Sequence, residues 1–161
     1  MTDFVFVYGS LLQFERAGPC VLRDHRRGWD VAMDNRKTIP GYKYYVDEAG
    51  GRPPVYVTYL AIAPETGSSV TGAAFAVDPT ALAALDRRER NYDRRDVTGL
   101  VDLDLGGRVW AYVGSAAGRA RCAKGRADGT AVVAAEYLAL VPGADPPDLP
   151  VRPLLRRDVG A

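Results

Sequence analysis

An apolar run that breaks at a glycine opens the chain and constrains the fold more than any other feature. Phe4–Val7 are all β-branched or aromatic, which indicates a buried strand. Tyr8 follows, and then Gly9 allows the backbone to turn sharply or to approach a ligand closely. The N–H groups of Ser10–Leu12 have no evident sheet partner, and successive free N–H groups can bind a carboxylate or an oxyanion. An ordinary strand that ends in a tight turn is the alternative.

Short strands separated by turn residues continue the pattern. We expect strands at Gly28–Asn35, Val55–Ile62 and Val70–Val77, with a turn at Pro64–Ser69. A hairpin of Leu100–Leu105 and Arg108–Gly114 is expected around Gly106-Gly107, a two-residue turn. Strands at this spacing favour a small barrel. Residues 13–27 are mixed and polar and are expected to cross the surface as a loop.

Helices are expected at two places. Asp78-Pro79 is a strong helix start, since an N-cap aspartate precedes a proline at the first helical position, and the helix should run from Thr80 to about Asn91. A second helix is expected over Thr130–Leu140. Residues 116–129 are small and basic and are expected to form a loop. The expected organisation is one domain over residues 1–141 and a tail over residues 142–161, whose five prolines prevent long regular structure.

Composition excludes several classes of protein. At 161 residues the chain has the size of one domain, and its formal net charge of +1 argues against a general nucleic-acid or membrane-surface protein. No segment approaches the ~20 apolar residues that a membrane span needs. Cys20 and Cys122 form no CxxC pair, so we expect free thiols and a cytoplasmic location. His25 is the only histidine, which excludes a histidine-rich metal site and leaves no evident base for a serine nucleophile.

Glu89 is the first candidate for a catalytic residue. On a helical wheel of about 100° per residue, Glu89 falls between Leu82 and Leu85 on the core-facing stripe, and the arginines around it point away. A lone carboxylate on an apolar stripe is costly unless it is paired or protonated, and such a group suits a general acid/base. The alternative is a helix-end glutamate that reaches solvent or pairs with Arg94.

With both segments considered together, the chain resembles the γ-glutamylcyclotransferase-like family, including its AIG2-like and γ-glutamylamine cyclotransferase members. Tyr8-Gly9-Ser10-Leu11 is similar to the family's Tyr-Gly-Ser/Thr-Leu loop. Residues 85–94, Leu-Asp-Arg-Arg-Glu-Arg-Asn-Tyr-Asp-Arg, are similar to its Leu-Asp-x-x-Glu-x-x-Tyr-x-Arg pattern. Residues 70–79 and Tyr112 follow in the expected order. The resemblance covers roughly Phe4 to Gly114.

The resemblance implies an α+β fold, a small mixed β-barrel flanked by helices, with a cavity between the Tyr-Gly-Ser-Leu loop and the glutamate. It implies an enzyme that cyclises a γ-glutamyl group: the α-amine attacks the γ-carbonyl, and 5-oxoproline and a free amine are released. No metal and no organic cofactor are implied. Glu89 would transfer protons, and Gly9, Ser10 and Leu11 would hold the substrate's carboxylate or the oxyanion. Tyr8 and Tyr112 are further substrate-binding candidates, or else core aromatics.

Two other functions remain open at this stage. The same cavity could serve a non-catalytic module that binds a carboxylate metabolite, although retention of Glu89 favours the enzyme. The basic segment Arg119–Arg126 could bind RNA or a scaffold partner, but it lacks interleaved aromatic residues and the net charge is near zero. The expected partner is a small γ-glutamyl substrate rather than nucleic acid or a membrane. The leaving amine and the oligomeric state are left open by the sequence.

Overall fold

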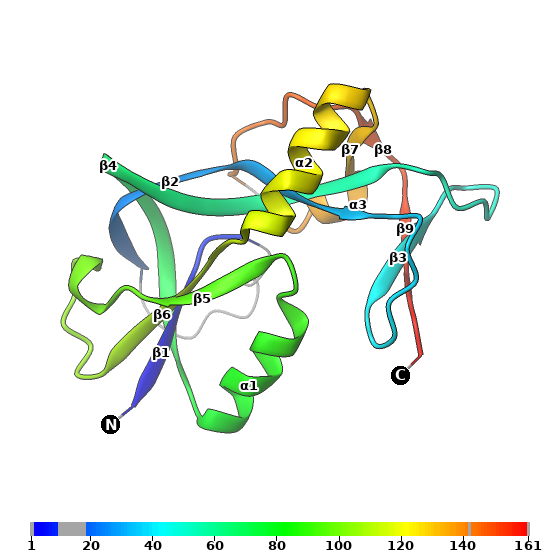
Figure 1. Ribbon diagram of the computed structural model, residues 1–161. Helices are drawn as coiled ribbons and strands as arrows, with labels where there is room; N and C mark the ends of the chain where they lie inside the picture. The colour runs from blue at the N-terminus through cyan, green and yellow to red at the C-terminus, as the bar shows by residue number, and fades with distance from the viewer. Residues whose placement is uncertain (1, 10–18, 142, 161) are drawn as a thin grey trace. The chain divides into compact units, whose positions relative to one another are not determined.

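The computed structural model describes residues 2–9, 19–141 and 143–160, which Figure 1 shows as a coloured ribbon. The strands and helices, in chain order, are β1 (Asp3–Val7), β2 (Pro19–Asp34), β3 (Lys43–Val46), β4 (Tyr56–Val77), α1 (Pro79–Arg88), β5 (Tyr92–Asp96), the 3-10 helix η2 (Thr98–Leu100), β6 (Arg108–Gly114), α2 (Ala116–Asp128), β7 (Ala131–Ala134), α3 (Ala135–Leu138), β8 (Val151–Arg152) and β9 (Leu155–Asp158).

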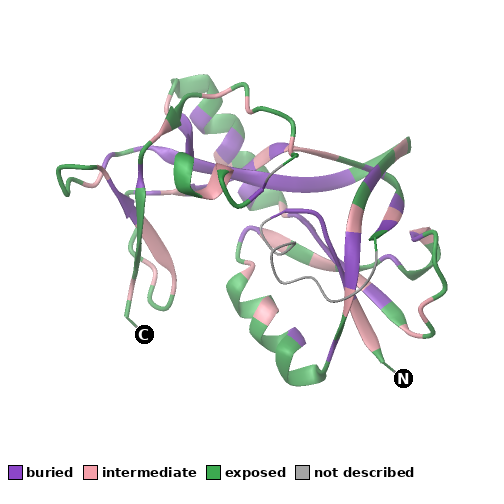
Figure 2. Cartoon of the chain, turned by 180° about the vertical axis from the view of Figure 1, so that it is seen from behind, coloured by how far each residue is buried: buried purple, intermediate pink, exposed green. Residues whose placement is uncertain are grey.

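The chain forms two compact units. The first contains Met1–Gly28 and Ala61–Gly114, and the second contains Trp29–Leu60 and Ser115–Ala161. The long strands β2 and β4 contribute residues to both. Each unit has its own buried cluster of apolar side chains, and Figure 2 shows the buried segments in purple.

In the first unit, β1 lies between two partners. It pairs antiparallel with β4, from Asp3 opposite Val77 to Val7 opposite Ala73, and parallel with β6. β5 pairs antiparallel with β6 on the far side. Mixed pairing with helices on the sheet confirms the α+β class. An isolated bridge joins Leu22 of β2 to Val101, which follows β5, and closure of the sheet into a barrel stays a prediction.

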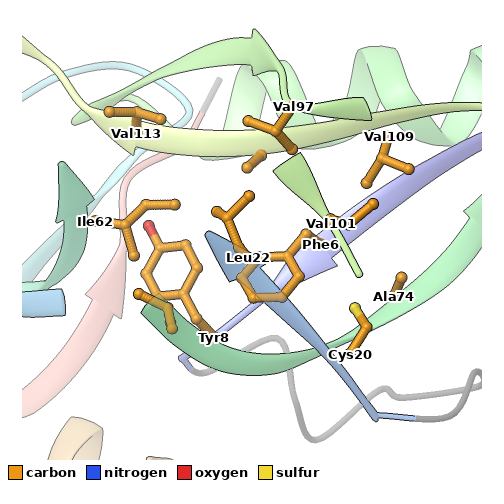
Figure 3. Close-up of a cluster of buried hydrophobic side chains, with 12 residues drawn as sticks. Phe6, Tyr8, Cys20, Leu22, Ile62, Ala74, Val97, Val101, Val109 and Val113 are labelled. Atoms are coloured by element: carbon orange, nitrogen blue, oxygen red, sulfur yellow. The ribbon is translucent and has the colours of Figure 1, made fainter. Parts of the chain in front are cut away.

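Side chains of β1 alternate between two apolar clusters. Phe6 is buried with Leu22, Val109 and other residues in the cluster that Figure 3 shows. Val5 and Val7 point to the other face, where they pack with Leu82 of α1. The alternation follows from the two-residue period of a strand. The prediction of a buried strand at the start of the chain is confirmed.

Helix α1 begins where the sequence predicts. The Asp78 carboxylate accepts a hydrogen bond from the Ala81 N–H at 2.7 Å, and Pro79 is the first helical residue. The helix ends at Arg88, so the expected extension to Asn91 is wrong. The chain turns directly into β5 instead, a polar strand that the hydrophobic pattern does not reveal because its residues do not alternate between apolar and polar.

Strands β2 and β4 are longer than predicted. β2 begins at Pro19, so the expected surface loop is wrong over its last nine residues, and β4 continues through the turn expected at Pro64–Ser69. Asp24 has a φ of 59°, and its carboxylate accepts the Gly67 N–H at 3.0 Å. The kink at Asp24 lets Leu22 and His25 both lie buried, which conceals the ordinary alternation of a strand.

The expected hairpin before β6 is also wrong. β6 itself is confirmed, but its antiparallel partner is β5 and not Leu100–Leu105. The intervening segment is irregular because aspartate side chains cap backbone N–H groups. Asp102 accepts the Val21 N–H at 2.8 Å and Asp104 accepts the Gly106 N–H at 3.0 Å. The Asp104 bond is local and competes with strand pairing, whereas the Asp102 bond joins this segment to β2.

In the second unit, the segment expected to be a basic loop is helix α2. Ser115 caps its start by accepting the Gly118 N–H at 3.0 Å, and Gly129 ends it with a φ of 71°. The buried face of α2 consists of the small residues Gly118, Cys122 and Gly125. Small residues give a weak hydrophobic period, which is why the sequence pattern does not indicate this helix.

The second predicted helix, Thr130–Leu140, is wrong over its first half. Ala131–Ala134 form the buried strand β7, and a helix of only four residues, α3, follows. β-branched Val132 and Val133 suit a strand, and β7 pairs in parallel with the start of β4. The proline-rich tail contributes two short strands: β8 pairs with β7, and β9 pairs with β3. The domain boundary at residue 141 stays a prediction.

Both cysteines are buried and carry free thiols, as predicted. Burial and the nearby Asp102 carboxylate raise the pKa of Cys20. Among the residues that the structure describes, no helix has the length and apolar character that a membrane span requires.

Candidate active site

The end of α1 presents Glu89 toward the interior of the first unit. Glu89 is the C-cap, and its N–H donates to the Leu85 carbonyl at 2.9 Å. Its side chain is 15% exposed, whereas that of Arg88 is 44% exposed, and Arg88 Nε lies 3.9 Å from the Glu89 carboxylate. Arg87 and Arg90 are exposed. The helical wheel therefore predicts the partial burial of Glu89, but Arg88 does not point away from it, since the two side chains form an ion pair.

Tyr112 lies on the same face of the sheet as α1. Its ring is buried with Val5, Val7 and Leu82, and its hydroxyl donates to Asp86 Oδ1 at 2.7 Å. Burial, the hydrogen bond to Asp86 and the negative charges of Asp86 and Glu89 raise the pKa of Tyr112, while the charge of Arg94 lowers it. Two predicted site residues, Glu89 and Tyr112, thus lie in one electrostatic neighbourhood.

Asp86 and Arg94 complete this neighbourhood, and the sequence analysis did not assign them to the site. Arg94 Nε lies 3.0 Å from Asp86 Oδ1, and the Arg94 guanidinium lies 4.4 Å from the centre of the Trp110 ring. Arg94 thus forms an ion pair with Asp86, and Glu89 has Arg88 as an ion-pair partner. The signal for Asp86 was its position three residues before Glu89, because residues at that spacing share a helix face.

Tyr8 belongs to the other face of the sheet. It is 8% exposed, and its ring stacks against Phe6 with the ring centres 6.4 Å apart. Its hydroxyl donates to the main-chain carbonyl of Tyr112 at 2.6 Å. Figure 3 shows the ring in the apolar cluster, near Ile62 and Leu22. Tyr8 therefore packs in the apolar core and ties the turn after β1 to β6, and its role in substrate binding stays a prediction.

The turn after β1 is described only as far as Gly9, which is buried. The predicted anion-binding residues Ser10 and Leu11 lie outside the described residues. Arg27 Nη1 donates to the Tyr8 carbonyl at 3.1 Å, so a guanidinium lies next to this turn. The sequence pattern does not distinguish Arg27, because it occurs in a run of charged residues that was expected to be a surface loop.

A cavity of about 360 Å³ lies elsewhere in the first unit. Arg23 and Asp102 contribute to its polar rim, and Val101, Leu105 and Val109 are apolar lining residues. None of the predicted site residues that the structure describes lines it. The Arg23 guanidinium donates to the Gly99 carbonyl at 2.9 Å, so this cation already supports the loop.

The basic residues of α2 have structural partners within the second unit. Arg121 Nε donates to the Ala32 carbonyl at 2.6 Å, and Arg126 Nη1 lies 2.9 Å from an Asp148 carboxylate oxygen. Lys124 lies 3.2 Å from Asp128. Each of these three cations thus has a partner within the second unit. Within the described residues, no group of three or more His, Cys, Asp or Glu side chains could hold a metal ion.

Comparison with protein families gives one match. A family model described as gamma-glutamyl cyclotransferase, AIG2-like, matches residues 5–139, which include Tyr8, Glu89 and Tyr112. Comparison with curated proteins found no match.

Several solved structures are similar to the chain. A gamma-glutamyl cyclotransferase is 18% identical with a TM-score of 0.47, and the alignment covers 71% of this chain and 68% of that chain. An Arabidopsis thaliana protein solved in solution is 22% identical, with a TM-score of 0.42 and coverage of 71% and 62%. An uncharacterized Homo sapiens protein is 18% identical, with a TM-score of 0.45 and coverage of 71% and 67%.

Proposed function

Because the chain belongs to the gamma-glutamyl cyclotransferase, AIG2-like family, we propose that it releases 5-oxoproline and a free amine from a γ-glutamyl amine or peptide. A new bond forms between the α-amine nitrogen and the γ-carbonyl carbon, and the bond from that carbon to the leaving nitrogen breaks. The reaction is intramolecular, so the enzyme must fold the substrate into a conformation in which the two reacting atoms are close.

Glu89 is the proposed general acid/base. It accepts a proton from the attacking α-amine and returns a proton to the leaving nitrogen, so one carboxyl group serves both steps. The observation that carries this assignment is the position of Glu89: 15% exposed at the end of α1, and near enough to the buried Tyr112 hydroxyl for its charge to raise the pKa of that phenol. A carboxylate withdrawn from water interacts strongly with a nearby reacting amine.

The remaining predicted residues have supporting roles in the proposal. Tyr112 contacts the substrate beside Glu89. The main-chain N–H groups of Gly9, Ser10 and Leu11 bind the substrate's α-carboxylate or the developing oxyanion. Tyr8 holds the start of this turn through its hydrogen bond to the Tyr112 carbonyl, and Arg27 adds a positive charge beside it.

The test is 5-oxoproline release from a panel of γ-glutamyl amines and peptides, with wild type, Glu89→Gln and a matched control, Glu48→Gln. Glu48 is exposed in a loop of the second unit. We expect Glu89→Gln to lose at least about a hundredfold in kcat, the usual range for a general acid/base, and Glu48→Gln to match wild type.

Three results would change the proposal. Equal loss in both variants would indicate a general effect of losing a carboxylate. Full activity of Glu89→Gln would exclude Glu89 as the acid/base. A wild type that binds γ-glutamyl compounds saturably and releases no 5-oxoproline would instead support the non-catalytic binding module.

A further inference from the structure

Asp86, Arg94 and Tyr112 form a connected set of polar side chains from three different elements, α1, β5 and β6. Asp86 Oδ1 accepts the Tyr112 hydroxyl at 2.7 Å and lies 3.0 Å from Arg94 Nε. The Tyr112 ring itself is 5% exposed and packed by apolar neighbours, so it has little freedom to turn away from Asp86.

The direction of the hydrogen bond limits what Tyr112 can do. A phenol has a single proton to donate, and Tyr112 donates it to Asp86. Toward any other group the oxygen offers only lone pairs. It can therefore accept an N–H from an amine, but it cannot donate to a carbonyl oxygen or to an oxyanion.

We propose that Asp86 is a positioning residue that holds Tyr112 as a hydrogen-bond acceptor for the reacting amine beside Glu89, and that Arg94 holds Asp86 in turn. The inference rests on the proposed function, and it assigns the amine side of the reaction to Tyr112. The oxyanion is then left to other donors.

Arg94 is itself held from two sides. Besides its contact with Asp86, its guanidinium stacks at 4.4 Å over Trp110, whose indole N–H donates to Asp3 at 3.3 Å. A chain of fixed side chains thus runs from the first strand to the Tyr112 hydroxyl. Supporting contacts of this kind determine how accurately a site is preorganised.

Burial and the charges around Tyr112 move the pKa of its phenol further above its ordinary value. Asp86 and Glu89 are negative and Arg94 is positive, and burial together with the two carboxylates outweighs the arginine, so the pKa of Tyr112 is raised. The phenol therefore stays a neutral acceptor over the whole physiological pH range.

The experiment is a double-mutant cycle of Asp86→Asn and Tyr112→Phe, with kcat and KM measured for 5-oxoproline release. The Asp86 side chain is 38% exposed, so its replacement should fold, and Asp86→Ala serves as a second variant. If Asp86 acts through Tyr112, each single variant lowers kcat by about tenfold to a hundredfold, the range expected for one hydrogen bond to a charged group. The double variant is then no slower than Tyr112→Phe alone.

A second readout does not depend on turnover. Tyrosinate absorbance is titrated in wild type, Asp86→Asn and the double variant, with Asp148→Asn as a control that removes an ion pair in the other unit. Loss of the Asp86 charge and hydrogen bond should let Tyr112 ionise at lower pH. One additional tyrosine should therefore titrate earlier in Asp86→Asn, and this signal should be absent from the double variant and from Asp148→Asn.

Multiplicative kcat losses in the double variant would overturn the inference and leave the proposed function intact. A tyrosine that titrates earlier in the double variant as well as in Asp86→Asn would not be Tyr112, and this result would overturn the inference too. A wild type without any 5-oxoproline release would refute the proposed function, and with it the role of Tyr112 in the reaction. The titration would still test whether the hydrogen bond and charge of Asp86 raise the pKa of Tyr112.

Discussion

Near the candidate site, Gly72 is a position where one added methyl group should clash directly with the backbone of β1. A Cβ on Gly72 would lie 2.1 Å from the Val7 carbonyl oxygen and 2.7 Å from Phe6 Cζ, whereas real Cβ contacts essentially never fall under 3.0 Å. Val7 directly precedes Tyr8 and Gly9. We therefore expect Gly72→Ala to displace β1 at the point where the proposed substrate-binding turn begins.

The size of the effect follows from the contact. The Val7 oxygen belongs to a paired strand, so the backbone must move by almost 1 Å to relieve the clash. Overpacking of this kind costs about 1–3 kcal/mol, and the entropic advantage of alanine in the unfolded chain offsets only about 0.4–1 kcal/mol. Because the clash involves the backbone, we take the upper part of the range for overpacking. The free energy of unfolding should then fall by about 2 kcal/mol, and Tm by about 4–8 °C for a chain of this size.

The assay is thermal unfolding followed by circular dichroism, paired with 5-oxoproline release. Gly99→Ala is the matched control, because no atom lies within 4 Å of a Cβ there and its φ is not positive. The control should be as stable as wild type or more stable by up to about 1 kcal/mol. Equal Tm values for Gly72→Ala and Gly99→Ala would refute the reasoning about close approach between β1 and β4.

Two further predictions concern the second unit. Asn35 is fully buried and bonds three main-chain groups of Tyr45 and Pro53, so Asn35→Ala should lose about 3 kcal/mol in urea unfolding; a loss below about 1 kcal/mol would mean that these bonds contribute little. The hydrogen bond from Arg36 lowers the pKa of Asp34, so the charged carboxylate stabilises the fold at pH values above its unfolded pKa of about 3.9. This stability is lost as the pH falls through the lowered folded pKa. Asp34→Asn should flatten the acid side of the stability profile, and an unchanged profile would contradict the linkage.

Strong local signals were sufficient for several elements. The apolar run of β1, the capped start of α1 and the strand β6 were predictable because side-chain chemistry over a few residues decides them. The face occupied by Glu89 was predictable as well, since the helical period places it between Leu82 and Leu85. The family was evident from the same two segments, because its motifs are short and local.

Other elements were not predicted, because their local sequence carries only a weak signal. Helix α2 buries glycine and cysteine rather than large apolar residues, so its period was hidden, and polar β5 is a strand because it pairs with β6. β7 forms a strand because it pairs in parallel with β4. Hydrogen bonds between residues far apart in the chain decide such elements, and no window of sequence contains both partners.

The sequence by itself indicated that the Glu89 side chain, at the C-cap of α1, faces inward. Only the tertiary structure decided that Tyr112 donates its proton to Asp86, that Arg94 pairs with Asp86, and that the Tyr8 ring lies in the apolar core. The helical period determines only the direction in which each side chain points away from the helix axis. Which side chain lies in that direction depends on the position of β6, the strand that carries Tyr112. Pairing with β1 and β5 sets that position, and this pairing is a property of the whole unit.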